Sequence, residues 1–173
     1  MKTKQVVVWI LIVIGLFGLL WLTGKTRVAS SQKEINTTEN QAKSSDNQLV
    51  ESETFYDFGI ISMKNGNVTK VFKVTNKTDK DILYPSLTTS CMCTAAYFVG
   101  LDGEKSGPFG MPGMGFVPKL EKTIKAGESA NIEVVYDPNA HGPAGVGKID
   151  RFVYLEDVDG NKLQFEIKAN VTP

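Results

Sequence analysis

The stretch Leu163-Gln164-Phe165-Glu166-Ile167-Lys168-Ala169-Asn170-Val171 alternates apolar and polar residues without a break. Successive side chains of a β-strand point to opposite faces, so this period of two predicts a strand with one buried face and one wet face. Residues 131–136 alternate in the same way, and residues 68–74 and 149–155 do so less regularly. From residue 51 onward no segment has the 3.6-residue period of an amphipathic helix. The globular part of the chain is therefore predicted to be all-β.

Other short apolar stretches complete the predicted set of strands, at residues 54–58, 81–88, 93–99 and 116–124. Clusters of Gly, Asn, Asp and Lys between the strands predict turns at residues 64–67, 76–80, 126–128 and 159–161. So many short antiparallel strands in about 120 residues favour an immunoglobulin-like (Ig-like) β-sandwich. A small closed barrel is the alternative architecture.

Two glycine-rich loops interrupt this pattern, at residues 100–118 and 141–147. The first is too long and too rich in Gly and Pro for a plain hairpin connection, and such loops are usually functional or disordered. Its apolar side chains need something to pack against, so we expect them to fold back onto the domain. These side chains are Phe109, Met111, Met114 and Phe116.

The amino-terminal end has a different composition. Residues 5–22 are almost entirely apolar, and as a helix they would reach roughly 27 Å, close to the thickness of a bilayer core. Trp9 and Trp21 stand near the two ends, and Lys2 and Lys4 precede them, which predicts a single transmembrane anchor with the rest of the chain outside the cytoplasm. A cleaved signal peptide would need a shorter apolar core and a small-x-small site close behind it.

The polar residues that follow cannot bury enough apolar surface to fold. The predicted organisation is therefore a cytoplasmic tip and membrane anchor at residues 1–24, a flexible linker at residues 25–50 and an Ig-like domain at residues 51–173. Lys and Arg together number 19, as do Asp and Glu, so the composition gives no sign of a nucleic-acid-binding surface. A single histidine is few for general acid–base catalysis at neutral pH, which favours a protein that is not an enzyme.

Both cysteines lie in Ser90-Cys91-Met92-Cys93-Thr94. In an extended strand their Cα atoms would be about 6.6 Å apart, so a relaxed disulfide between them is not expected without a local kink. Three possibilities stay open: two thiols buried in the core, a thiol redox pair, or a Cu(I) site. Soft thiolate and thioether ligands favour Cu(I), and imidazole can join them. The candidate Cu(I) ligands are Cys91, Cys93, Met111, Met114 and His141.

Counting strands indicates how these candidates could meet. If residues 93–99 cross the whole sandwich, the cysteines and the 100–118 loop lie at opposite ends, unless that loop folds back along the domain. Two predicted strands separate the 100–118 loop from His141, so Met111, Met114 and His141 are expected at one end, away from the cysteines.

Five short motifs stand out along the domain: Phe55-Tyr56-Asp57-Phe58-Gly59, Phe72-Lys73-Val74-Thr75-Asn76, Thr89-Ser90-Cys91-Met92-Cys93-Thr94, Ala126-Gly127-Glu128 and Val134-Val135-Tyr136-Asp137-Pro138. Together they resemble a bacterial family catalogued as domain of unknown function 1573. The resemblance covers residues 53–172 and implies an exported, Ig-like domain similar to major-sperm-protein and Hydin-type domains. It implies no activity. The chain departs from the family pattern in having Met92, where glycine is usual, and in the apparent insertion at residues 100–118.

The prediction is a membrane-anchored, extracytoplasmic binding module without catalytic activity, held at the cell membrane by one span and directed at an unidentified protein partner. The first alternative is a Cu(I)-binding or copper-handling domain built on the cysteine pair. The second is a thiol redox protein.

Overall fold

The computed structural model describes residues 49–51 and 53–173. The predicted span at residues 5–22 and most of the predicted linker at 25–50 lie outside these residues. The end of that linker differs from the prediction, because Leu49–Glu51 forms a short strand, β1. Within the described part of the chain, no helix is both long enough and apolar enough to cross a membrane.

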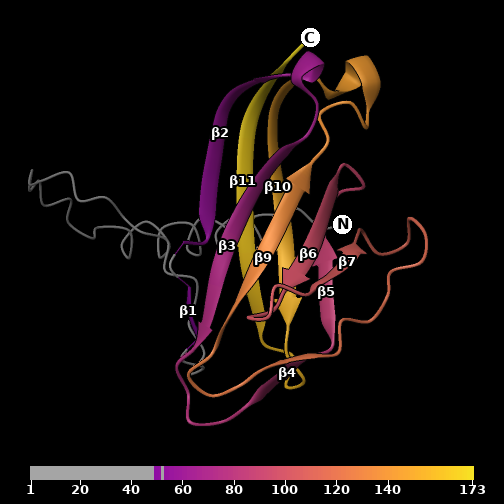
Figure 1. Ribbon diagram of the computed structural model, residues 1–173. Coiled ribbons are helices and arrows are strands. Elements are labelled where there is room, and N and C mark those ends of the chain that lie inside the picture. Colours follow the sequence, from indigo (N-terminus) through magenta and orange to yellow (C-terminus); the bar gives the residue numbers. More distant parts are fainter. Residues whose placement is uncertain (1–48, 52) are drawn as a thin grey trace, which may run out of the picture. The chain divides into compact units, whose positions relative to one another are not determined.

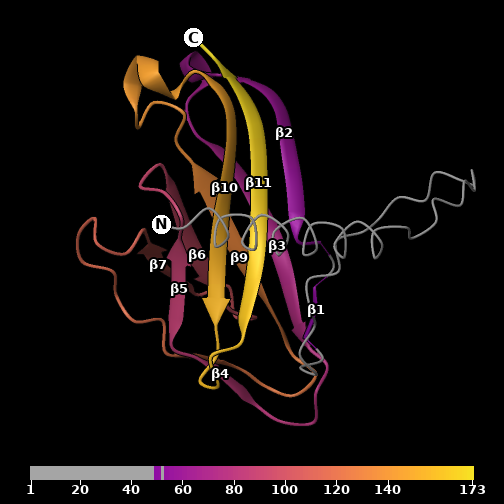
Figure 2. The same cartoon turned by 180° about the vertical axis from the view of Figure 1, so that it is seen from behind.

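The described residues form a two-layer β-sandwich (Figures 1 and 2). One sheet has the order β1-β3-β9-β6-β7, formed by Leu49–Glu51, Val68–Asn76, Ser129–Tyr136, Thr94–Val99 and Lys105–Phe109. The other has the order β2-β11-β10-β5, formed by Phe55–Ser62, Lys162–Thr172, Gly147–Glu156 and Ser86–Thr89. A small third pair joins β4 (Ile82–Tyr84) to β8 (Lys122–Ile124). The predicted all-β, Ig-like sandwich is confirmed.

The core lies between the two sheets and follows the alternation of the sequence. Phe165, Ile167 and Val171 of β11 are buried, and the polar residues between them face outward. Strand β9 buries every second residue in the same way. The rings of Phe72 on β3 and Phe165 on β11 approach to 5.1 Å between centroids, so the two sheets meet through aromatic contact.

Two strand predictions and one loop prediction were wrong in part. The strand expected at residues 81–88 breaks at Pro85, which has no N–H to donate, and its halves β4 and β5 join different sheets. Of the strand expected at 116–124, only Lys122–Ile124 forms. The 100–118 region is not a continuous loop: β7 lies within it and pairs antiparallel with β6.

One buried polar side chain ties the turns at one end of the sandwich together. Asn76 is fully buried at the end of β3, and its Nδ2 donates to the carbonyl oxygens of Lys80 and Ile124, at 2.7 and 2.9 Å. Its Oδ1 accepts from the backbone N–H and the hydroxyl of Thr78, at 3.0 and 2.7 Å. The side-chain amide thus fixes the turn that follows β3 and holds it against β8.

We expect Asn76→Ala to lower the free energy of unfolding by about 2–4 kcal/mol, because it leaves buried donors and acceptors without partners. Urea denaturation of the full-length chain in detergent measures this change. Asn170→Ala is the matched control, since Asn170 is exposed on β11 and its loss should cost little. Equal destabilisation by the two substitutions would contradict this role for Asn76.

Candidate functional site

The cysteines lie in a turn between β5 and β6, and not in an extended strand. The turn brings the Cα atoms of Cys91 and Cys93 to 5.2 Å, and the two sulfurs form a disulfide. The Thr94 N–H donates to the Cys91 carbonyl oxygen at 3.1 Å, which closes the turn. A disulfide was not expected here without a local kink, and the turn supplies the kink that a bond between these positions requires.

Hydrogen bonds connect the cysteine turn to strands of both sheets. The hydroxyl of buried Thr89 lies 3.0 Å from the carbonyl oxygens of Cys91 and Thr94. Ser90 bonds reciprocally with Phe152 of β10: its N–H donates to the Phe152 carbonyl oxygen, and its Oγ accepts from the Phe152 N–H, each at 2.9 Å. These bonds hold the cysteine turn in place at one end of the sandwich.

His141 reaches the cysteine turn through the pairing of β6 with β9. Thr94 pairs with Tyr136, and the next N–H along, that of Asp137, donates to the Cys93 carbonyl oxygen at 2.9 Å. The connection from β9 to β10 therefore starts beside the cysteines. His141 lies in it, just before the 3-10 helix η2 (Gly142–Gly145), with its Nε2 3.3 Å from Cys91 Sγ. A disulfide sulfur carries no proton, so Nε2–H is the donor.

The three side chains form one cluster with graded exposure. One ligand atom from each of Cys91, Cys93 and His141 lies within 4.8 Å of the other two. Cys93 is buried, Cys91 is half-buried and His141 is exposed. The cluster is therefore anchored in the core on one side and open to solvent on the other.

Arg151 is a fourth member that the sequence did not indicate. It lies on β10, and its Nε donates to Cys93 Sγ at 3.1 Å while Nη1 donates to the Asp150 carbonyl oxygen at 2.8 Å. A guanidinium at this distance stabilises a thiolate once the disulfide is reduced. Burial raises the pKa of the nearby Tyr136 hydroxyl above its usual range, the charge of Arg151 opposes that rise, and Asp137 adds to it.

The candidate ligand His141 lies at the cysteine end of the sandwich, and its predicted placement away from the cysteines was wrong. Strand counting placed it with Met111 and Met114, away from the cysteines, but β7 reverses the chain along β6 and the strand expected at 116–124 is mostly absent. The loop that follows β7 starts near the cysteine turn, because the Thr89 N–H donates to the Gly110 carbonyl oxygen at 3.1 Å. Met111 is half-buried and Met114 is exposed. Copper binding by either methionine stays a prediction.

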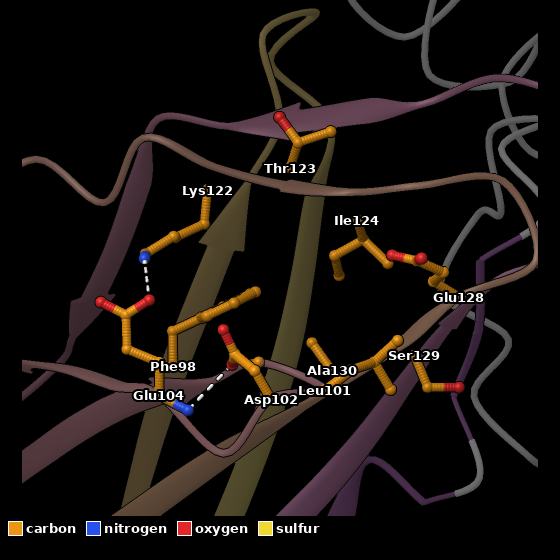
Figure 3. Close-up of a pocket in the computed structure, with 11 residues that line it drawn as sticks. Phe98, Leu101, Asp102, Glu104, Lys122, Thr123, Ile124, Glu128, Ser129 and Ala130 are labelled. Atoms are coloured by element: carbon orange, nitrogen blue, oxygen red, sulfur yellow. Dashed lines mark hydrogen bonds and ion pairs between the residues drawn. The ribbon is translucent and has the colours of Figure 1, made fainter.

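A pocket of about 250 Å³ lies at the other end of β6. Its lining combines apolar side chains, such as Phe98 and Ile124, with charged ones (Figure 3). Lys122 and Glu104 form an ion pair at 3.2 Å, and the Asp102 carboxylate accepts from the Glu104 N–H at 2.9 Å. Lys122 and Glu104 pair with each other and Asp102 accepts from a backbone N–H, so most of the charged groups of this pocket already have partners in the protein.

Comparisons with known proteins agree with the fold. The family model described as "Protein of unknown function (DUF1573)" matches residues 49–100, a range that includes the cysteine turn, and this confirms the predicted resemblance. Among solved structures, a protein of unknown function from Porphyromonas gingivalis W83 superposes with a TM-score of 0.50 at 16% identity over 76% of this chain. This chain spans about half of that protein, 51% of its length, and the similarity concerns the fold alone.

Two smaller domains match with lower scores. The PapD-like domain 7 of human CEP192 has a TM-score of 0.45 at 11% identity and covers 83% of this chain and 98% of its own. A major-sperm-protein family member of C. elegans, WR4, has a TM-score of 0.41 at 6% identity and covers 73% of this chain and 99% of its own. No curated protein matches the sequence.

We expect the native chain to resist thiol alkylation until it is reduced, since both cysteines are in the disulfide. After reduction without denaturant, Cys91 should react before Cys93, because Cys91 is half-buried whereas Cys93 is 2% exposed. Mass spectrometry of peptides after timed alkylation measures the order. Alkylation of either cysteine before reduction, or of Cys93 first, would contradict this arrangement; a chain unfolded in urea, in which both should react alike, is the control.

Proposed function

We propose that the chain is a membrane-anchored, extracytoplasmic, non-catalytic module that binds another protein through its β7–β8 loop, residues 110–121. One observation carries this proposal: Phe116 is 91% exposed and Met114 is 60% exposed in this loop. We had expected both side chains to pack on the domain, and that expectation was wrong for these two. Phe109, at the loop's start, is buried as expected.

Exposure of these two apolar side chains to water is unfavourable. Their burial against a partner protein would be favourable. Burying a phenylalanine side chain is worth about 1.5–3 kcal/mol, and aromatic anchors in pockets dominate many protein interfaces. Figures 1 and 2 show the segment between β7 and β8 extending outward from the sandwich. A protruding apolar tip suits an apolar groove on a partner protein. Lys119 and Glu121 at the loop's end offset each other in charge, which gives the loop no preference for an anionic lipid surface.

The membrane location rests on the apolar residues 5–22 and on the polar residues that follow them. A span with a short basic tip inside the cell places an Ig-like domain outside the cytoplasm, on a linker that lets the loop reach a partner at or near the membrane.

A photoreactive amino acid at position 116 of the full-length chain, activated in intact bacterial cells, should give a discrete adduct with a second protein. The same residue at position 119, also exposed in this loop, is the matched control and should give less adduct. An adduct of two copies of this chain would assign the loop to self-association. No adduct at 116 above the level at 119 would refute the proposed binding surface.

The same adduct reports the location of the domain. Protease added to intact spheroplasts should digest it, because the proposed orientation puts the domain outside. Survival of the adduct there, together with digestion after lysis, would place the domain inside. As a control for folding, Phe116→Ser should leave the melting temperature of the chain unchanged, since that side chain packs little against the domain.

A further inference from the structure

We propose that the reduced cysteine turn binds one Cu(I) ion through Cys91 Sγ, Cys93 Sγ and His141 Nε2, and that formation of the disulfide closes this site. The inference rests on the cysteine turn and is independent of the β7–β8 loop that carries the proposed binding function.

The three ligand atoms lie close to the spacing that a shared ion requires. Thiolate and imidazole ligands bind comparable metal ions at about 2.0–2.3 Å, so two ligands of one ion lie at most about 4.6 Å apart. In this structure the three atoms all lie within 4.8 Å of one another. The oxidised turn therefore needs only a separation of the two sulfurs and a small adjustment of His141 to accept an ion.

The surroundings hold these ligands in place. Cys93 is fixed by the hydrogen bond from Asp137 to its carbonyl oxygen and by its burial in the core. Cys91 is positioned by Thr89, whose hydroxyl lies 3.0 Å from the Cys91 carbonyl oxygen. His141 is exposed and offers the ion an approach from solvent. Ligands held by outer interactions in this way give a metal site its affinity.

The charge balance favours a monovalent soft ion. Two thiolates and one Cu(I) carry a net charge of −1, and the Arg151 guanidinium 3.1 Å from Cys93 Sγ brings the total to zero. A divalent ion such as Zn²⁺ in the same place would leave a net charge of +1 beside a buried sulfur. Structural zinc sites also take four protein ligands, whereas this cluster supplies three. Thiolates with imidazole are ligands that Cu(I) accepts.

Reduction of the disulfide opens the site by thiol–disulfide exchange with an external dithiol. An external dithiol transfers two electrons and two protons to the Cys91–Cys93 disulfide, which yields two thiols here and one disulfide on the donor. Cu(I) then displaces the two thiol protons and binds both sulfurs. His141 binds through an unprotonated Nε2, with its remaining proton on Nδ1. Oxidation of the two thiolates by a disulfide acceptor reverses the sequence and releases the ion.

Anaerobic titration of the full-length chain in detergent with Cu(I), against a chromophoric Cu(I) chelator, tests the proposal. The reduced chain should bind one equivalent, and the oxidised chain should bind none. This comparison uses the wild-type protein in both states and does not depend on a variant that could misfold.

Variants then identify the ligands. Cys91→Ser and Cys93→Ser should each weaken binding by more than about 100-fold, beyond the usual effect of losing an outer-shell partner. His141→Ala should weaken it too, and His141→Met should restore part of the loss because a thioether is also a soft ligand. Phe116→Ser, a change in the exposed loop that removes no candidate ligand, is the control and should leave affinity unchanged.

Several results would overturn the proposal. Equal binding by the oxidised and reduced chains would remove the disulfide as the gate. Unchanged affinity in Cys93→Ser, or a loss in Phe116→Ser, would place the copper elsewhere. Retention of Zn(II) in preference to Cu(I), when the reduced chain is offered both, would refute the charge argument for the monovalent ion.

Discussion

The pairing of β6 with β9 is the constraint on which the candidate site depends. Its register sets Thr94 opposite Tyr136, so the chain leaves β9 beside the turn that enters β6. The hydrogen bond from the Asp137 N–H to the Cys93 carbonyl oxygen extends the ladder one step beyond the strands. Because of this step, two segments separated by about 45 residues in sequence share one end of the sandwich. His141 meets the cysteines as a result of strand register and not of local sequence.

The second sheet completes the site from the other side of the core. Two neighbouring residues of β10 contact the cysteine turn: Arg151 donates to Cys93 Sγ, and the Phe152 N–H donates to Ser90 Oγ. Both layers of the sandwich therefore contact the turn. The buried sulfur of Cys93 is thereby kept beside a positive charge, which favours its thiolate after reduction. Meanwhile the β7–β8 loop presents apolar side chains to solvent. The domain thus combines a cysteine turn held by both sheets with a loop that exposes Met114 and Phe116.

Much of the fold could be predicted from sequence, because burial on one face of a strand imposes a period of two. This held for β9 and β11, whose alternating residues are buried as expected. The cysteine turn was missed because Cys and Met suit a strand as well as a turn, and only its hydrogen bonds to Thr89 and Phe152 distinguish the two. The approach of His141 to the cysteines depends on the pairing of β6 with β9, and the position of Arg151 depends on the pairing of Val153 with Thr89. Neither register is visible in one sequence.

The proposed site for a soft metal ion consists of Cys91, Cys93 and His141, which strand register and burial bring together. X-ray absorption at the copper edge, on the reduced, Cu(I)-loaded full-length chain, tests this site most directly. We expect two sulfur neighbours and one nitrogen neighbour, with the nitrogen lost in His141→Ala. A spectrum with no sulfur neighbours, or a nitrogen that persists in His141→Ala, would contradict it.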